Sequence, residues 1–402
     1  MTILQIGAAF VAAQKQIEIA IHHALEKKGY TSYILYSHGS SSDPHVIRFE
    51  GRILNIIRRC FLKMFGKNPV FASLSTICLI RKIKKIQPNL VHLHVIHHGY
   101  INYTMLFKYL AKEKIPVVFT MHDMWAFTGG CYHFADISCD GYLNQCYNCP
   151  KDTKQLDCQR KKTRKYFKLK KELFEQLYSV SFVSVSSWVY EETQKSYLKK
   201  YPQYLIWNAV DSAFCIEQTS ENLPSEKFKI IGVANNWSDQ KGLSRFFELA
   251  KLLGDEFEII LVGNISKKIQ SEAPDNIVFV GSVRNSNELA MLYASCDLHV
   301  SMSFEETFGM TFVEAAFAGI RSLGFDSTAI PGVLRQINGF VISKADVLAA
   351  VAKIRELRQN REKCRLDLEE KRYIESIFSA SFMAEKYIDI YAKQISTVSD
   401  QS

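Results

Sequence analysis

Apolar and polar positions along the chain follow two alternating patterns, one typical of buried strands and one typical of amphipathic helices. The first apolar run covers residues 2–6, and the helical pattern that follows it over 14–28 ends at Gly29. Another apolar run at 32–36 predicts the next strand. Later runs of the same kind predict buried parallel strands at 90–95, 117–120 and 181–185.

The same rhythm restarts after residues 208–211. It predicts strands at 229–234, 258–262, 277–280, 298–301 and 321–324, and helices at 242–253, 286–294 and 311–318. Two such blocks indicate an α/β protein with two doubly wound, Rossmann-like domains. We place the first domain at 1–205 and the second at 206–381, with a last helix over 382–402 that packs back on the first. Ligands bind at the carboxyl ends of strands in such sheets, so a cleft between the domains is the expected site.

Composition agrees with two folded domains. The chain has 402 residues, of which 47% are apolar and 23% charged, as in soluble globular proteins. No apolar run is long enough to cross a membrane. The first residues lack the basic start of a signal peptide and are typical of a strand. We therefore expect a cytoplasmic protein.

The net charge of +9 is distributed unevenly, with +15 over residues 1–203 and −6 over 204–402. Two basic segments, 52–67 and 151–171, account for much of the excess. In the first, apolar and basic residues are interleaved at helical spacing, as in helices that lie on membranes. We expect contact with an anionic membrane surface, and the alternative is a solvated basic edge. No nucleic-acid-binding motif accompanies the charge, so nucleic acid is not an expected partner.

The most informative segment for chemistry is 303–319. A strand ends just before it, and a loop containing Gly309 leads into a helix whose first amides form an anion site. Glu306 precedes this helix and Glu314 lies inside it, so both carboxylates can flank one bound molecule. The alternative is that Glu306 is a solvated loop residue and Glu314 only interacts with the helix dipole.

This segment resembles the E-x7-E motif of family 4 retaining glycosyltransferases, which have the GT-B fold. Other segments resemble further motifs of the family in the correct order: 279–283, 288–293, 296–300 and 318–320. A narrower resemblance, to enzymes of bacterial capsule, O-antigen and exopolysaccharide synthesis, depends on segments 122–131, 148–150 and 233–242.

The resemblance implies a role for each matching residue. Glu306 would bind hydroxyls of the donor sugar, Glu314 the ribose hydroxyls, and Lys241 the phosphates. The amides of Phe308, Gly309, Met310 and Thr311 would meet the diphosphate or sugar. Gly281 and Val283 would lie near the base, Gly7 near the donor, and His122 near the transferred sugar. Ammonium and amides together stabilise a leaving diphosphate, so catalysis is expected to need no metal or other cofactor.

The chain departs from the family pattern at two places. Family members usually carry an arginine near the lysine, whereas Asn235, Asn236 and Gln240 are neutral here, and Arg245 is a candidate replacement. The glycine-rich turn after the first strand is reduced to Gly7 followed by alanines. A nucleotide-sugar epimerase of the same fold and a non-catalytic nucleotide-sugar-binding subunit therefore stay open as alternatives.

Two further clusters carry possible ligands. Four cysteines, Cys131, Cys139, Cys146 and Cys149, lie within 19 residues and end in a C-x2-C pair. This spacing suits a tetrahedral thiolate site, which predicts a structural zinc ion, and the alternative is four reduced thiols on a long insertion. The histidines at positions 92, 94, 97 and 98 surround one strand end. They are candidates for lining the acceptor pocket, with a structural role as the alternative.

The function expected from the sequence is that of a retaining hexosyltransferase. It would move a sugar from a nucleoside diphosphate sugar to a glycan, carried on a polyprenyl diphosphate, in the synthesis of a cell-surface polysaccharide. Its expected place is peripheral, at the inner face of the plasma membrane.

Overall fold

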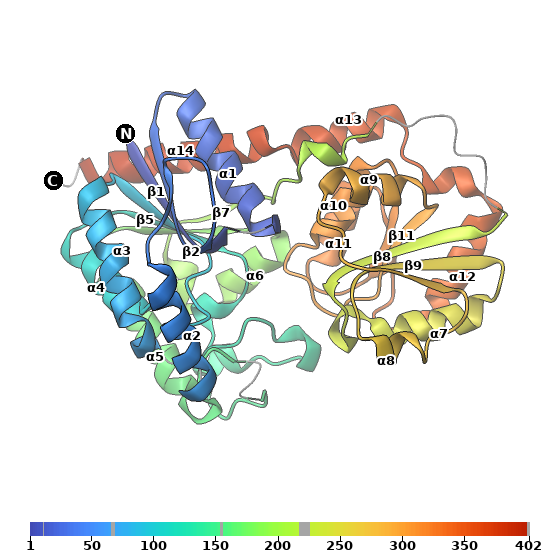
Figure 1. Cartoon of the computed structure of the whole chain (residues 1–402), viewed down its shortest axis with the longest axis horizontal. Coiled ribbons are helices and arrows are strands. Elements are labelled where there is room, and N and C mark those ends of the chain that lie inside the picture. Colours follow the sequence, from blue (N-terminus) through green and yellow to red (C-terminus); the bar gives the residue numbers. More distant parts are fainter. Residues whose placement is uncertain (11, 66–68, 153–155, 217–225, 400–402) are drawn as a thin grey trace. The chain divides into compact units, whose positions relative to one another are not determined.

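The computed structural model describes the chain except residues 11, 66–68, 153–155, 217–225 and 400–402 (Figure 1). Val11, 66–67 of the first basic segment and 153–155 of the second therefore lie outside the described residues. The chain forms two compact units. Unit 1 comprises Met1–Trp207 and Met383–Ser402, and unit 2 comprises Asn208–Phe382.

Unit 1 is built on a parallel seven-stranded sheet in the order β3-β2-β1-β4-β5-β6-β7. Its central strands are buried along their whole length, because helices cover both faces. The strands are β1 Thr2–Phe10, β2 Thr31–Gly39, β3 Val46–Arg48, β4 Leu90–Leu93, β5 Val117–Met121, β6 Val180–Ser184 and β7 Gln203–Leu205.

The longer helices of unit 1 are α1 Ala12–Lys27, α2 Arg52–Phe65, α3 Ser73–Ile86, α4 Tyr103–Lys112, α5 Thr163–Gln176, α6 Ser187–Lys195 and α14 Ala380–Ser399. Helix α1 ends as predicted near Gly29, whose φ of 77° permits the Tyr30 amide to bond the Leu25 carbonyl at 2.9 Å. In the part of the chain that the structure describes, no helix is long and apolar enough to cross a membrane.

Unit 2 is built on a parallel six-stranded sheet in the order β10-β9-β8-β11-β12-β13. Its strands are β8 Phe228–Asn236, β9 Phe257–Asn264, β10 Ile277–Val280, β11 Leu298–Ser301, β12 Ser322–Phe325 and β13 Phe340–Ile342. Its helices are α7 Leu243–Leu253, α8 Lys267–Gln270, α9 Ser286–Ala294, α10 Met310–Phe317, α11 Ile330–Gln336, α12 Val347–Gln359 and α13 Leu368–Ile377. The two doubly wound parallel sheets confirm the predicted fold class.

Each sheet has a point at which the strand order reverses, and ligands bind there in folds of this kind. In unit 2 the reversal lies between β8 and β11, so the loops that follow these two strands meet at one edge of the sheet. Those loops carry Lys241 and Glu306. In unit 1 the reversal lies between β1 and β4, where Gly7 and the histidines after β4 are found.

Candidate functional site

The two loops at the reversal point of unit 2 are fastened to each other through their backbones. The Phe304 amide donates to the Gln240 carbonyl at 3.2 Å, and the Ser303 hydroxyl donates to the same oxygen at 3.3 Å. Gly242 has a φ of 85°, and a Cβ there would overlap the Met302 carbonyl. The fit is therefore close enough to require glycine, and it holds both loops in one arrangement.

Lys241 and Glu306, which are 65 positions apart, form an ion pair across these loops. The Lys241 Nζ lies 2.6 Å from the Glu306 Oε1. The backbone of Glu306 is fixed in turn, because its amide and carbonyl both bond the Thr328 hydroxyl at 3.0 Å. The lysine side chain is 41% exposed and the glutamate 19%. A pair this open to water stabilises the fold little, so a ligand can displace either partner at small cost.

The first turn of α10 follows directly after this pair. Gly309 is its N-cap residue with a φ of 89°, and a Cβ there would come within 2.6 Å of the Phe312 ring. Because glycine has no side chain to cap the helix, the amides of Met310 and Thr311 at the helix start suit an anion. Phe308, just before the glycine, is buried. The predicted anion-binding segment therefore has suitable backbone geometry.

Glu314 lies further along α10 and is half-buried. Its Oε2 accepts a hydrogen bond of 3.2 Å from the hydroxyl of Tyr293, a fully buried residue of α9. Burial raises the pKa of the Glu314 carboxyl to about 7, against a hydrogen bond from Tyr293 that lowers it. The carboxyl can consequently bind hydroxyl groups in either protonation state near neutral pH. Tyr293 closes the family-like segment 288–293, but the sequence gives no signal that it bonds Glu314.

Arg245, the candidate replacement for the family arginine, is engaged within unit 2. Its Nε and Nη2 bond the Met302 carbonyl at 3.1 and 2.9 Å, and Nη2 also bonds the Asp239 carbonyl at 2.9 Å. The guanidinium also stacks on the Phe304 ring, 3.6 Å from its centroid. In this structure Arg245 therefore holds the two loops together and has few donors left for a phosphate.

The two residues predicted near the base lie after β10. The Gly281 carbonyl accepts a bond of 3.2 Å from the Gly263 amide, and no described atom lies within 4 Å of the position that a Cβ would occupy. Val283 is half-buried. Space is available for a flat ring beside Gly281, and the role of both residues stays a prediction.

In unit 1, Gly7 lies on β1 against a buried acid. A Cβ at Gly7 would overlap the carboxyl of Glu18, a residue of α1 that is 3% exposed. Burial raises the pKa of that carboxyl to about 8, so Glu18 is largely protonated at neutral pH. The small size of Gly7 therefore makes room for Glu18, which no pattern in the sequence indicates.

His122 follows β5 and is half-buried. Its Nε2 lies 3.1 Å from the Nδ1 of His94, and the two rings are stacked with centroids 5.4 Å apart. Burial lowers the pKa of His122 to about 4, so the ring is neutral at pH 7. A neutral imidazole can donate or accept one hydrogen bond to a sugar hydroxyl, whereas it carries no charge to stabilise an anion.

The other histidines and acidic groups near His122 are paired among themselves or with neighbouring residues. The Nε2 of His97 lies 3.0 Å from the Asp123 carboxylate, and His97 also stacks on Trp125. Burial raises the pKa of Asp123, but His97 and the Trp125 amide lower it to about 2 overall. His92, a candidate for the acceptor pocket, is fully buried and bonds the Tyr391 hydroxyl at 2.7 Å. With its other ring nitrogen bonded to the Thr120 hydroxyl at 2.7 Å, His92 fits the structural alternative better than a place in an acceptor pocket.

The four predicted zinc ligands line one small cavity of about 30 Å³. Backbone amides point at two of the sulfurs, from Gly129 to Cys146 at 3.0 Å and from Gly141 to Cys139 at 3.4 Å. Such bonds suit thiolates that bind a metal. Among the described residues, however, no three of these sulfurs lie within 4.8 Å of one another. The group that meets this distance is His22, Glu26 and Asp43. The four sulfurs are therefore neighbours, but they do not converge on a single point.

A fifth cysteine belongs to this neighbourhood. The Cys158 thiol donates to the Gly129 carbonyl at 3.2 Å, beside the amide that bonds Cys146. Burial raises the pKa of the Cys158 thiol to about 12, against an opposing effect of the nearby Lys170 ammonium. The sequence gives no spacing signal for Cys158, because nine positions separate it from Cys149.

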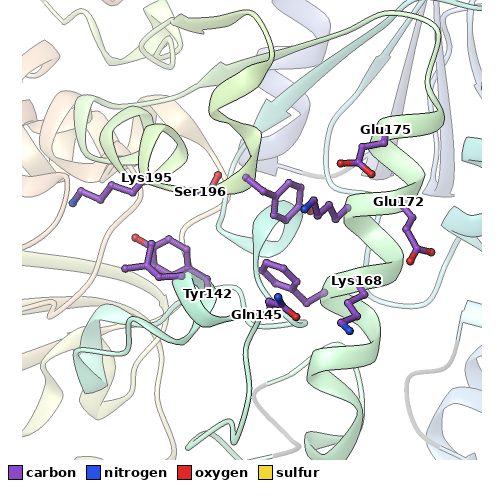
Figure 2. Close-up of a pocket in the computed structure, with 11 residues that line it drawn as sticks. Tyr142, Gln145, Lys168, Glu172, Glu175, Lys195 and Ser196 are labelled. Carbon is purple, nitrogen blue, oxygen red and sulfur yellow. The ribbon is translucent and has the colours of Figure 1, made fainter.

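A larger cavity of about 420 Å³ lies between α5, α6 and the turn at 141–144 (Figure 2). Lysines, glutamates and aromatic rings line it, including Lys168, Glu175, Lys195 and Tyr142. Two of its charges are already paired, Glu175 with Lys200 at 2.7 Å and Lys195 with Glu192 at 2.8 Å. Its described lining includes none of the predicted donor or catalytic residues.

Three basic residues of the two basic segments are buried, so they do not contribute to the predicted contact with a membrane. Arg58 is paired with Glu50 at 2.8 Å, and Lys151 with Asp136 at 2.7 Å. Lys170 donates to the Trp125 carbonyl and lies over the Trp125 ring, 4.1 Å from its centroid. Burial lowers the pKa of Lys170 to about 8. These side chains hold the fold together and cannot reach a membrane.

Comparison with known proteins covers both units. Residues 19–214 match the model of glycosyltransferase family 4, and residues 216–373 match that of glycosyl transferases group 1. The chain is 24% identical over 367 residues to the putative colanic acid biosynthesis glycosyl transferase WcaC of Escherichia coli K12, which covers 86% of each protein. It is 27% identical over 192 residues, 44% of this chain and 49% of the other, to the alpha-galactosylglucosyldiacylglycerol synthase of Streptococcus pneumoniae.

Solved structures give the same result for the fold. Anabaena HepE, determined in complex with UDP-glucose, superposes with a TM-score of 0.63 over 99% of this chain and 100% of the other, at 12% identity. This likeness confirms the GT-B fold expected from the sequence.

Proposed function

The chain belongs to the family 4 glycosyltransferases, and from that premise we propose that it transfers a hexose from a nucleoside diphosphate sugar to a lipid-carried glycan, with retention of configuration. The observation that carries this proposal is the Lys241–Glu306 pair, 2.6 Å apart, beside the start of α10. A cation, a sugar-binding carboxylate and an anion site meet there at the carboxyl ends of two strands. This is the combination that a diphosphate sugar needs.

In the proposed complex, the diphosphate takes the place of Glu306 as the partner of Lys241. Glu306 is then free to accept hydrogen bonds from sugar hydroxyls, and the amides at the start of α10 bond the phosphate oxygens. Glu314 accepts bonds from the ribose. The leaving diphosphate gains negative charge in the transition state, and a fixed ammonium with helix amides stabilises that charge without a metal ion.

His122 supplies the remaining contact in this proposal. Its ring is held by His94 and is neutral, so it can bond a hydroxyl of the sugar as positive charge develops at the anomeric carbon. We assign no protein nucleophile. The departing phosphate oxygen takes the proton of the acceptor hydroxyl on the same face of the sugar, which gives retention.

The proposed acceptor is a glycan on polyprenyl diphosphate, in the assembly of a cell-surface polysaccharide. Two relatives support this choice, since one is named for colanic acid biosynthesis and the other for a glycosylated diacylglycerol. A lipid-carried acceptor would bring the enzyme to the inner face of the plasma membrane as a peripheral protein.

A panel of nucleoside diphosphate sugars tests the proposal, beginning with UDP-glucose because HepE was determined with it. We expect one donor to raise the melting temperature and to give a glycosylated lipid whose new bond keeps the donor's anomeric configuration by NMR. Stabilisation without transfer to any lipid fraction would favour a non-catalytic binding subunit. That alternative is supported by the engagement of Arg245 in loop contacts, away from a phosphate role. A free sugar isomer formed from donor alone would instead favour an epimerase.

We also propose that Cys131, Cys139, Cys146 and Cys149 hold one structural zinc ion. Their common cavity and the amides that point at Cys139 and Cys146 support this, and binding would require the sulfurs to move closer together. The ion would brace the insertion that follows His122 and would take no part in the transfer.

A further inference from the structure

Helix α2 differs from an ordinary surface helix, because it exposes an apolar stripe and buries two of its polar residues. Its polar residues Asn55 and Arg58 are buried, at 5% exposure each. Its apolar residues Ile53, Ile56 and Met64 face solvent, at 75%, 61% and 66% exposure. A surface helix of a soluble protein normally buries its apolar stripe and exposes its charges. The sequence predicted the helical spacing but not which side is buried.

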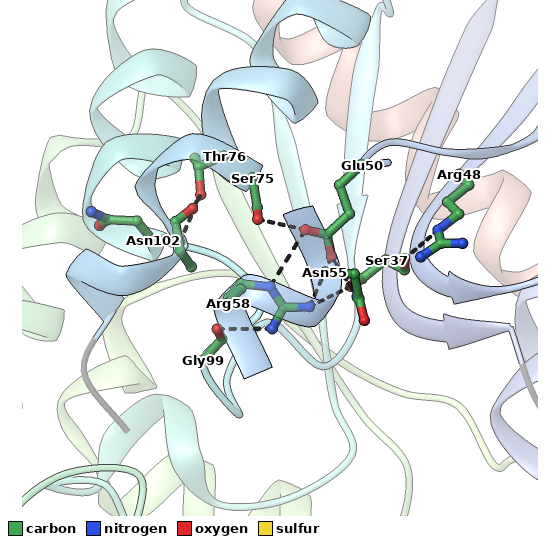
Figure 3. Close-up of polar contacts among 10 residues, drawn as sticks. Ser37, Arg48, Glu50, Asn55, Arg58, Ser75, Thr76, Gly99 and Asn102 are labelled. Atoms are coloured by element: carbon green, nitrogen blue, oxygen red, sulfur yellow. Dashed lines mark hydrogen bonds and ion pairs between the residues drawn. The ribbon is translucent and has the colours of Figure 1, made fainter. Parts of the chain in front are cut away.

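A hydrogen-bonded network holds α2 in this orientation (Figure 3). The Glu50 carboxylate accepts bonds from Arg58 and Asn55, each at 2.8 Å, and from the hydroxyls of Ser37 and Ser75. The Arg58 Nη1 donates to the Gly99 carbonyl at 3.2 Å. Breaking a buried ion pair of this kind is strongly destabilising, because one charge is left uncompensated. The outward position of the apolar stripe is therefore built into the fold.

The exposed stripe continues beyond α2. The Phe61 ring stacks on Phe71 at 5.8 Å, and exposed Val70, Leu74 and Ile77 extend the surface onto the start of α3. Of the 21 large apolar residues that are exposed in the described chain, eight lie between residues 53 and 77. We call these eight the apolar face: Ile53, Ile56, Ile57, Phe61, Met64, Val70, Leu74 and Ile77. Contiguous apolar surface of this kind is rare on a monomer unless something covers it.

The charge around the apolar face is of one sign. Exposed Arg52, Arg59 and Lys63 lie along one side of α2, and Arg81 follows Ile77 by one turn of α3. Between Glu50 and Glu113 the sequence has eleven lysines and arginines and no aspartate or glutamate. Apolar residues flanked by basic ones suit the boundary between acyl chains and anionic headgroups.

We infer that the apolar face docks unit 1 on an anionic lipid bilayer, with α2 lying in the plane of the surface. Ile53, Ile56 and Met64 enter the acyl boundary, while Arg52, Arg59 and Lys63 bond lipid phosphates. The alternative of a solvated basic edge would require the apolar residues of this segment to pack on the core, and Ile53, Ile56 and Met64 do not. Leu62 is an exception, since it packs beside Gly99, and the Phe65 side chain lies outside what the structure describes.

This docking deepens the proposed function and rests on it in one respect, because a lipid-carried acceptor would lie at the same membrane surface. The docking and the transfer reaction can nevertheless be disproved separately. The test is co-sedimentation of the full chain with vesicles of phosphatidylglycerol and phosphatidylethanolamine, and with neutral phosphatidylcholine vesicles, at low and high salt. The wild type should bind the anionic vesicles, lose most binding as salt rises, and retain a salt-insensitive remainder. Transfer to an acceptor without its lipid tail should not change with vesicles.

Two sets of variants make the test specific. Ile53→Ser, Ile56→Ser and Met64→Ser together should lower vesicle binding at least about tenfold and remove the salt-insensitive part. Arg52→Gln, Arg59→Gln and Lys63→Gln together should remove the salt-sensitive part. The matched control is Leu348→Ser with Leu368→Ser, two residues of unit 2 exposed at 67% and 64%, which should bind as wild type.

Three outcomes would overturn the inference. The wild type could remain in solution with anionic vesicles at low salt. The Ile53, Ile56 and Met64 variant could bind as wild type while it melts at the same temperature. Finally, the wild type could fail to bind vesicles and form a dimer by light scattering, while the triple serine variant is a monomer. A second copy of the chain would then cover the apolar face.

Discussion

At the scale of single residues, the carboxyl groups of Glu306 and Glu314 have different surroundings, which predict different roles. Glu306 is paired with a cation in a loop, whereas Glu314 lies against a buried tyrosine on a helix. A contact to the ribose is the same before and during the reaction, whereas a contact to the sugar strengthens as charge develops there. The two residues should therefore differ in the kinetic constant that each affects.

We expect Glu314→Ala to raise KM for the donor, and Glu306→Ala to lower kcat, each on the order of tenfold or more. Steady-state kinetics with the donor identified from the panel measure both constants. Glu272→Ala is the matched control, since Glu272 is an exposed acid of the same unit. Unchanged kinetics in either variant would remove that glutamate from the site.

The raised pKa of Glu314 leads to a second prediction, which concerns how the stability of unit 2 depends on pH. The carboxyl titrates at about 7 in the folded chain and at 4.5 in a free side chain, so the folded state holds the proton more tightly. Between these pH values the free energy of unfolding of the wild type must fall as pH rises, because the Glu314 carboxyl ionises less readily in the folded state. Glu314→Gln has no ionisable group at this position and shows no such fall. We expect the variant to gain about 1–3 kcal/mol relative to wild type between pH 4 and pH 8. Calorimetry of the unit 2 transition at several pH values measures the difference, and parallel pH curves for the two proteins would contradict it.

At the scale of elements, the sequence predicted the helices and strands that have a long apolar pattern. It did not predict very short strands or contacts between residues far apart in the chain. Helix α9 at Ser286–Ala294 and strand β11 at Leu298–Ser301 were predicted to the residue. Strands β3, β7 and β13 were not predicted, because three residues are too few to show a period. The family motifs assign Lys241 and Glu306 to one donor, but their direct ion pair joins positions 65 residues apart and no local pattern in the sequence shows it.

The insertion after β5 carries the metal prediction. Protein purified without metal-affinity chromatography should hold about one zinc per chain by elemental analysis. Replacing Cys146 with serine should abolish zinc and lower the melting temperature of unit 1, whereas Cys60→Ser is the control, because Cys60 is an exposed thiol on α2. Four alkylatable thiols without metal would instead leave the cysteines as reduced side chains of the insertion.

At the scale of the whole molecule, unit 1 is discontinuous in sequence, and its last helix is joined to its sheet by polar contacts. On α14, the Tyr387 hydroxyl lies 2.9 Å from the Thr120 hydroxyl, and the Tyr391 hydroxyl lies 2.7 Å from the Nδ1 of His92. Gln394 bonds the Ser179 hydroxyl at 2.6 Å. Because all of these groups except Ser179 are buried, losing one partner leaves the other unsatisfied.

We therefore predict that Tyr391→Phe lowers the stability of unit 1 by about 1–3 kcal/mol and leaves unit 2 unchanged. Calorimetry with separate transitions for the two units measures this. Tyr373→Phe serves as the control, since Tyr373 is an exposed residue of α13. An equal shift of both transitions would mean that the units unfold together.

The discontinuity of unit 1 also sets the order in which a cell can complete it. A ribosome that has made residues 1–207 must still make all of unit 2 before Met383 and the helix behind it emerge. At about 5–20 residues per second, this delay is on the order of ten seconds or more. During that time His92 and Thr120 lack their tyrosine partners, and the apolar face is already exposed. The nascent first unit is thus a natural client for chaperones, or for the membrane itself.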